Sequence, residues 1–232
     1  ATDSKNKSTE LTITITVTKK EKDDGTGYEK SVKYTVVDSK GNDITNKKDA
    51  NVYLNNDGNI YVEVKNYEEP EIHKGVKDVT NQDSGYNADE VHTWVIESDI
   101  PSNLDNYKLY DIVDNIDYRL KFEGTNKVVV KIGNTTLKEG TDYKISFVEN
   151  TNGVQNKTTS GKLTLTFLDT ENGMNASTTL KNNQGKKIQV IFNTTFAKDE
   201  NGNLLATMGE QIPNQAKLEY INTSSDNKVT KE

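Results

Sequence analysis

The chain has 232 residues, of which 31% are hydrophobic and 28% are charged, with a formal net charge of −7 and a pI near 5.1. This acidic balance disfavours nucleic acid and anionic membranes as partners, because both are bound through basic patches. The sequence has no cysteine and only two histidines, which excludes disulfides and disfavours a structural zinc site. No stretch reaches the roughly 18 apolar residues that a membrane-spanning helix needs. No signal peptide opens the chain and no sorting motif closes it, so we expect it to be a segment of a longer protein.

The first 69 residues are predicted to form a compact β block. Residues 10–18 (ELTITITVT) alternate Leu11, Ile13, Ile15 and Val17 with threonines, as a half-buried strand does. Further strands are expected at 32–37 and 60–67, and Asn, Asp and Gly mark the turns DSKGND and NNDGN. Four or more strands are therefore expected before Pro70.

The rest of the chain is predicted to be a second β domain. Short alternating runs, separated by Gly, Asn and Asp turns, indicate a sandwich rather than a parallel α/β sheet. One helical turn is expected at 174–182. The expected strands are 71–79, 91–97, 107–114, 127–132, 142–148, 162–168, 187–196 and 215–221. The fold class is therefore all-β with two tandem β-sandwich domains, 1–69 and 70–232.

The first and last strands of this second domain each direct a polar group inward. In PEIHKGVKDV (70–79), Lys74 shares the apolar face of Ile72 and Val76. In IPNQAKLEYIN (212–222), Asn214 shares the face of Ala216 and Leu218. A bare ammonium on a buried face is costly, so the inward lysine needs an explanation.

A third polar candidate lies in YKLYDIVDNIDYRLKF (107–122). Asp114 shares one face with Tyr110 and Ile112, and Asp111 shares the other face with Val113. Both faces carry apolar residues, so strand parity does not choose between the two aspartates.

An inward lysine, aspartate and asparagine fit one reaction. Burial lowers the pKa of an amine and raises the pKa of a carboxyl. A neutral lysine is a nucleophile, and a protonated aspartic acid can polarise the Asn carbonyl as a general acid. Attack on that carbon expels ammonia and leaves an amide between the two side chains, which removes the charge of the lysine.

Other chemistries find little support in the sequence. His73 lies off the apolar face of its strand and is expected at the surface, while His92 is expected to be packed or hydrogen-bonded near Trp94. The chain has no Gly-x-Ser-x-Gly elbow, phosphate loop, dinucleotide fingerprint or calcium loop. We therefore expect no metal, no cofactor and no enzyme with multiple turnovers.

The second domain resembles the isopeptide-forming domain of Gram-positive fimbrial proteins, which is CnaA-like in fold. The resemblance covers about residues 70–222. It rests on five motifs in the same order: PEIHKGV, HTWVIESDIP, IVDNIDYRLKF, GKKIQVIF and IPNQAKLEYIN. It implies a cross-link between Lys74 and Asn214 with Asp114 as the catalytic acid, and it prefers Asp114 because Leu120 follows at the family's spacing. The alternates are Lys77, which lies on the opposite face, and Asn222, which has the right parity at a polar strand end.

The first block resembles a small immunoglobulin-like or Cna-type repeat of surface proteins. Repeats of that kind that form isopeptides use an inward glutamate. Glu63 points away from the apolar face of its strand, and Lys19 and Lys20 lie at a strand end. We therefore expect no second cross-link in residues 1–69.

The resemblance implies a structural role on the outside of a Gram-positive cell. We expect a segment of a surface pilus or adhesin, joined to other pilus subunits or the cell wall by a sortase-type linkage outside this chain. The alternative is an adhesin domain that binds host matrix protein or glycan. A glycosidase would need paired carboxylates in an aromatic-lined cleft, and the single tryptophan lies within a strand.

Overall fold

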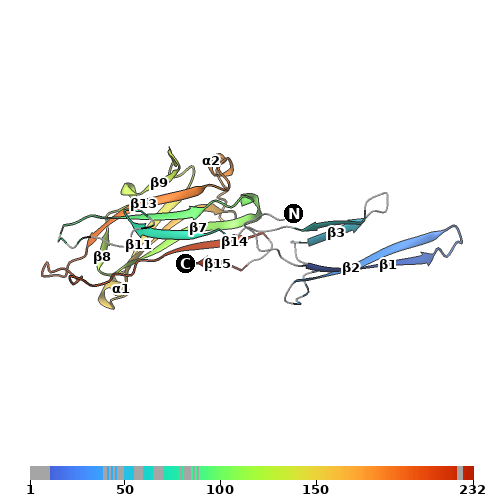
Figure 1. The fold of residues 1–232 in the computed structure, drawn as a ribbon, viewed down its shortest axis with the longest axis horizontal. Coiled ribbons are helices and arrows are strands. Elements are labelled where there is room, and N and C mark those ends of the chain that lie inside the picture. Colours follow the sequence, from blue (N-terminus) through green and yellow to red (C-terminus); the bar gives the residue numbers. More distant parts are fainter. Residues whose placement is uncertain are drawn as a thin grey trace. The chain divides into compact units, whose positions relative to one another are not determined.

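The chain forms two compact units, Ala1–Tyr67 and Glu68–Glu232 (Figure 1). The boundary lies two residues before the predicted one, and the independence of the two units as domains stays a prediction. The turn predicted at 55–59 and Val79, at the end of a predicted strand, lie outside the described residues. The computed structural model describes residues 11–38, 41, 43, 45, 50–54, 60–64, 70–78, 80, 85, 87, 89–223 and 227–232.

The first unit contains two antiparallel hairpins. Strands β1 (Leu11–Glu21) and β2 (Tyr28–Asp38) pair over all 11 residues of each strand, and β3 (Ala50–Leu54) pairs with β4 (Ile60–Val64). Val36 is fully buried, and three partly buried side chains pack against it: Ile13, Ile15 and Tyr34. Val17 continues the alternation but is 55% exposed. Each hairpin is a sheet of its own, so the sandwich expected for residues 1–69 stays a prediction.

The second unit is built from two antiparallel sheets. The first sheet has the order β10-β9-β13-β6-β5, and β8 pairs with the end of β13. Its strands are β5 (Ile72–Val76), β6 (His92–Asp99), β8 (Leu120–Phe122), β9 (Val129–Ile132), β10 (Thr135–Thr136) and β13 (Lys187–Phe196).

The second sheet has the order β11-β12-β7-β14-β15. Its strands are β7 (Tyr107–Asp117), β11 (Lys144–Glu149), β12 (Thr159–Asp169), β14 (Ala216–Asn222) and β15 (Val229–Lys231). Two short helices, α1 (Thr151–Gln155) and α2 (Thr178–Lys181), and two 3-10 turns, Leu104–Asn106 and Thr125–Lys127, connect the strands. With five and four residues, the α-helices of the described chain are far too short to span a bilayer.

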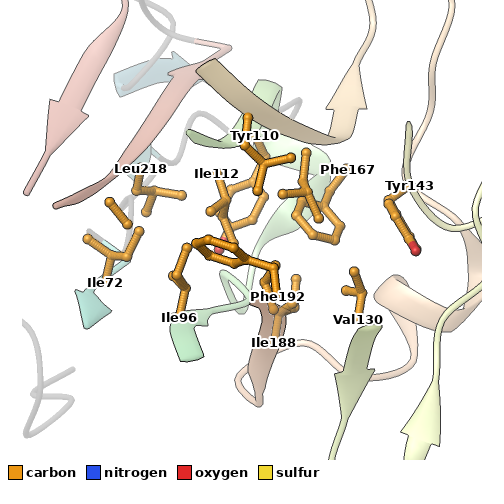
Figure 2. Close-up of a cluster of buried hydrophobic side chains, with 14 of the residues drawn as sticks. Ile72, Ile96, Tyr110, Ile112, Val130, Tyr143, Phe167, Ile188, Phe192 and Leu218 are labelled. Atoms are coloured by element: carbon orange, nitrogen blue, oxygen red, sulfur yellow. The ribbon is translucent and has the colours of Figure 1, made fainter. Parts of the chain in front are cut away.

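One hydrophobic core fills the space between the two sheets (Figure 2). Ile96 and Phe192 enter it from the first sheet, and Ile112, Phe167 and Leu218 enter it from the second. Alternate residues along each strand point inward, so the period-2 pattern of the sequence becomes the inner face of a sandwich. The all-β class is therefore confirmed, and the second unit has the expected two-sheet form.

The predicted strands of the second unit are all present: the strand at 187–196 has the predicted bounds, and the others have shifted ends. The helical turn expected at 174–182 is α2. Strands β8, β10 and β15 were not predicted, because two or three residues carry too little alternation to be recognised. Strand β7 continues to Asp117, three residues beyond its predicted end.

Candidate cross-linking site

Lys74 enters the core from β5, the edge strand of the first sheet. Its neighbours Ile72 and Val76 are buried, and its own side chain is 7% exposed. The inward direction expected from strand parity is therefore observed. His73, on the opposite face, is half-exposed as expected.

The ammonium of Lys74 contacts Oδ2 of Asp114, whose side chain is fully buried. Asp114 projects from β7 in the opposite sheet, so the pair bridges the two layers of the sandwich. Burial lowers the pKa of Lys74 and raises the pKa of Asp114, while the opposite charge of each partner works against the shift. Burial is the largest cause for both groups, so the pair is driven toward its neutral form.

Two aromatic rings line the lysine nitrogen. Nζ lies 4.7 Å from the ring centroid of Trp94 and 5.3 Å from that of Phe192. The indole is held in place because its Nε1–H donates to Oγ1 of Thr194 at 2.9 Å. These apolar walls keep water from the amine and account for the strong effect of burial on its pKa.

Asn214 lies two residues before Ala216, the first residue of β14, and Ala216 is paired with Asp114. Strand β14 also contacts β5, which carries Lys74. Both polar atoms of the Asn214 side chain are buried, and neither has a hydrogen-bond partner among the described residues. The same holds for Oδ1 of Asp114. A buried carboxamide without partners is costly, and such groups need an explanation.

The alternates do not share this site. Lys77 follows β5, is exposed, and has a left-handed backbone with φ of 67°. Asn222 is opposite Tyr107, at the other end of β7 from Asp114. Asp111 lies on the opposite face of β7, next to Thr166 and Glu219 in the neighbouring strands.

The remaining candidate residues of the sequence do not form a second site among the described residues. His92 is 3% exposed and packs edge-on against Phe196, with ring centroids 4.5 Å apart, as expected for a packed histidine. Lys19 and Lys20 are exposed, and the side chain of Glu63 lies outside the described residues. Within the described ranges, no group of three or more His, Asp and Glu side chains is placed to hold a metal ion.

Sequence reasoning missed a second ionic group, in which the buried pair Asp117 and Arg119 meets the exposed Glu210. Arg119 lies in the turn between β7 and β8, where no alternation marks it. Its partner Glu210 lies in the long connection before β14. Such a contact between two loops leaves no periodic signal in a single sequence.

The structure therefore defines a two-sheet β protein with a buried lysine on β5, a buried aspartate on β7, and an asparagine with a buried side-chain amide just before β14. No protein-family model and no curated protein matches the chain. Solved structures of Gram-positive major pilins do match. The 35 kDa C-terminal fragment of the major pilin GBS80 of Streptococcus agalactiae is 25% identical, with a TM-score of 0.51, over 70% of this chain and 53% of that one.

The major pilin subunit BcpA of Bacillus cereus is similar over a longer stretch. It is 20% identical with a TM-score of 0.56, over 91% of this chain and 56% of its own. An Asp-to-Ala variant of BcpA gives 20% identity and a TM-score of 0.57, over 96% of this chain and 62% of its own. The chain thus has a pilin-like fold and spans little more than half the length of these pilins.

Proposed function

We propose that this chain is a structural segment of a Gram-positive surface pilus, locked by an isopeptide bond between Lys74 and Asn214. The pilin-like fold supports the structural role. The observations that carry the cross-link are the buried contact of Lys74 with Asp114 and the buried carboxamide of Asn214, which lies two residues before the partner of Asp114 on β14 and has no hydrogen-bond partner among the described residues. Forming the bond would remove the buried charge of Lys74 and would replace the primary amide of Asn214, with two N–H donors, by a secondary amide with one.

The reaction begins with a proton transfer within the Lys74–Asp114 pair. Burial lowers the pKa of the amine and raises the pKa of the carboxyl, so the proton moves to Asp114 and Lys74 becomes a neutral nucleophile. Protonated Asp114 then donates a hydrogen bond to Oδ1 of Asn214 and polarises its carbonyl.

The lone pair of Lys74 Nζ next attacks Cγ of Asn214. The tetrahedral carbon expels Nδ2, which leaves as ammonia with the proton that Nζ loses, and the Asp114 carboxyl carries that proton between the two nitrogens. One C–N bond forms and one breaks, with no change of oxidation state and no cofactor. The reaction occurs once in each molecule, so the protein is not an enzyme in the sense of repeated turnover.

The position of the bond suits a structural role. Strands β5 and β14 are the first strand and the last long strand of the second unit. A covalent link between Lys74 and Asn214 joins β5 to the residues just before β14, so tension along the chain bypasses the sheets between them. Other pilus subunits or the cell wall are the partners, joined by a sortase-type linkage through segments outside this chain, and the location is the bacterial cell surface.

The alternative expectation, an adhesin domain that binds host matrix protein or glycan, is not favoured by the likeness to major pilins. A structural segment needs only a stable connection between its ends that does not lengthen under tension. The single proposal is therefore this tension-bearing role in the pilus, called the stalk function below.

Intact-protein mass spectrometry tests the proposal directly. The folded protein is expected to weigh one ammonia less than its sequence, and Lys74→Ala is expected to have its full sequence mass. An unshifted wild-type mass in folded protein overturns the cross-link. A loss of two ammonias would instead show a second bond and contradict the expectation for residues 1–69.

A further inference from the structure

Arg119 joins the strand that carries Asp114 to the segment that carries Asn214. Its guanidinium forms a two-point contact with Asp117, from Nε to Oδ1 at 2.7 Å and from Nη2 to Oδ2 at 2.9 Å. The backbone N–H of Arg119 also donates to Asp117 Oδ1 at 2.9 Å. Arg119 and Asp117 are 7% exposed, so the contact is shielded from water. Asp117 is the last residue of β7, three residues after Asp114.

The third nitrogen of the same guanidinium reaches the long connection between β13 and β14. Nη1 of Arg119 contacts Oε1 of Glu210 and lies 3.4 Å from the carbonyl oxygen of Gln211, to which it donates. Glu210 Oε2 in turn accepts from the backbone N–H of Thr207 at 3.0 Å. Gln211 is three residues before Asn214.

The connection between β13 and β14 has few packing contacts on the side that faces a cavity. Residues Glu210 to Pro213 line a cavity of about 830 Å³, with Trp94 and His92 on its other walls. Ile212 packs against the core, but the cavity offers the segment few atoms for van der Waals contact on its other side, so polar contacts add to the packing there. Arg119 supplies such contacts from a rigid, buried guanidinium.

We propose that Arg119 and Glu210 form a clamp that positions Asn214 against Lys74 and Asp114 before the cross-link forms. The inference rests on the proposed function. Arg119 is a positioning residue, because it touches neither the amine nor the carboxamide in its contacts with Asp117, Glu210 and Gln211. Its side chain fixes the distance between the end of β7, which carries Asp114, and the connection that carries Asn214.

The chemistry of the clamp fits this task. A guanidinium can form parallel hydrogen bonds to a carboxylate while its third nitrogen binds another acceptor, which the ammonium of lysine cannot do in one plane. Attack on an amide requires reacting atoms held about 3–3.5 Å apart, and a shift of about 1 Å can cost roughly a hundredfold in rate. The pKa of Glu210 lies below its ordinary value, because the backbone N–H of Thr207 and the guanidinium of Arg119 stabilise its carboxylate. The clamp is therefore charged at neutral pH.

The test compares the rate of ammonia loss in full-chain variants. Protein is synthesised in a short cell-free pulse, chased for increasing times, quenched in denaturant and weighed intact. Glu210→Gln keeps the size of the side chain but loses its charge, and it is expected to slow the reaction by about tenfold. Arg119→Lys keeps the positive charge but loses the planar guanidinium that binds Asp117 and Glu210 together, and a similar slowing of the reaction is expected. The matched control is Glu219→Gln on β14, which breaks the ion pair of Glu219 with Lys228 and should react at the wild-type rate.

The outcomes separate the clamp from a merely structural contact. Each variant is first shown by circular dichroism to be folded at the reaction temperature, so a lower stability alone leaves the rate unchanged. Slowing in both clamp variants, but not in the control, supports the proposal. Wild-type rates in folded Glu210→Gln or Arg119→Lys overturn the clamp while the cross-link stands. A wild-type protein that never loses ammonia overturns the proposed function and the clamp together.

Discussion

Asp114 on β7 is paired directly with Ala216 on β14, two residues after Asn214. This register brings the acid to the end of the strand that follows the asparagine. Lys74 reaches the same carboxyl from the other sheet. A shift of β14 by one residue would turn Ala216 and its neighbours to the opposite face, so the pairing of these two strands decides whether the three groups can meet.

The assignment of the acid can be tested by changing Asp111 and Asp114 of β7 one at a time. Asp114→Asn keeps the shape of the side chain but cannot transfer a proton, so the folded variant is expected to have its full sequence mass. Asp111→Asn, the matched control on the opposite face of the same strand, is expected to lose one ammonia as the wild type does. Intact-protein mass spectrometry reads out both. The reverse pattern would assign the catalytic role to Asp111.

Asp111 gives a prediction about pH. Burial is the main cause that raises the pKa of Asp111 from 3.8 to about 6, and the nearby Glu219 adds to it, while Thr166 and Lys228 work in the opposite direction. Between these values the folded protein holds a proton that the unfolded chain has lost. The free energy of unfolding therefore falls as the pH rises through this window.

Asp111→Asn removes this titration and should raise the melting temperature at about pH 7, with little effect near pH 4. Thermal denaturation of wild type and variant across this range measures the difference. Equal stabilisation at both pH values would contradict the prediction, because an effect of packing does not depend on protonation.

Strand alternation predicted most of the second unit because both sheets have one face in the same core. It could not choose between Asp111 and Asp114, since β7 is buried on both faces: Ile112 is 0% and Val113 is 2% exposed. In the structure, the contact with Lys74 from the other sheet distinguishes Asp114 from Asp111. Parity along one strand contains no information about what lies across the core.

The ends of strands and the loop contacts were the least predictable features. Strands β1 and β2 extend to Glu21 and Tyr28 through charged residues, because backbone pairing continues beyond the apolar stretch. Arg119 and Glu210 are 91 positions apart in the sequence, and neither lies in a periodic segment. Contacts of this kind depend on the path of the chain, which a single sequence does not reveal.

The hydroxyl of Tyr110 connects the two sheets. It donates to the carbonyl oxygen of Asp99 at 2.5 Å and lies 2.8 Å from Oγ of Ser98. Tyr110→Phe leaves these buried groups without that partner and should cost about 1–3 kcal/mol of unfolding free energy. Thermal denaturation measures the loss, and the mass should still show that one ammonia has left.

Tyr143→Phe is the matched control for Tyr110→Phe. Both rings pack against Phe167, with centroids about 6 Å away. No hydrogen bond of the Tyr143 hydroxyl is found in the described part of the chain, so removing it should change stability less. Equal melting temperatures of the two variants would show that the inter-sheet hydrogen bond contributes nothing.

The cross-link should also determine how the second unit responds to heat and force. Lys74 and Asn214 are about 140 residues apart in the sequence, and closing a loop of that length stabilises a fold by roughly 5 kcal/mol in the chain-entropy account. Lys74→Ala should therefore melt about 10–20 °C lower and be cut faster by proteases. Lys74→Arg is a useful comparison, because it keeps a buried cation but cannot form the amide.

Pulling on single molecules from the two termini tests the stalk function itself. In the wild type, force enters the second unit through β5 and leaves through β14, so the covalent link carries it and the segment between Lys74 and Asn214 cannot extend. In Lys74→Ala the same segment is free to unfold, and its release should lengthen the molecule by about 3.3–3.6 Å for each of its residues. The first unit is the same in both proteins, so its extension is an internal reference, and any difference in length comes from the second unit. Equal extension of wild type and Lys74→Ala would mean that the bond does not carry the load, and the stalk mechanism would then fail even if the mass shows a cross-link.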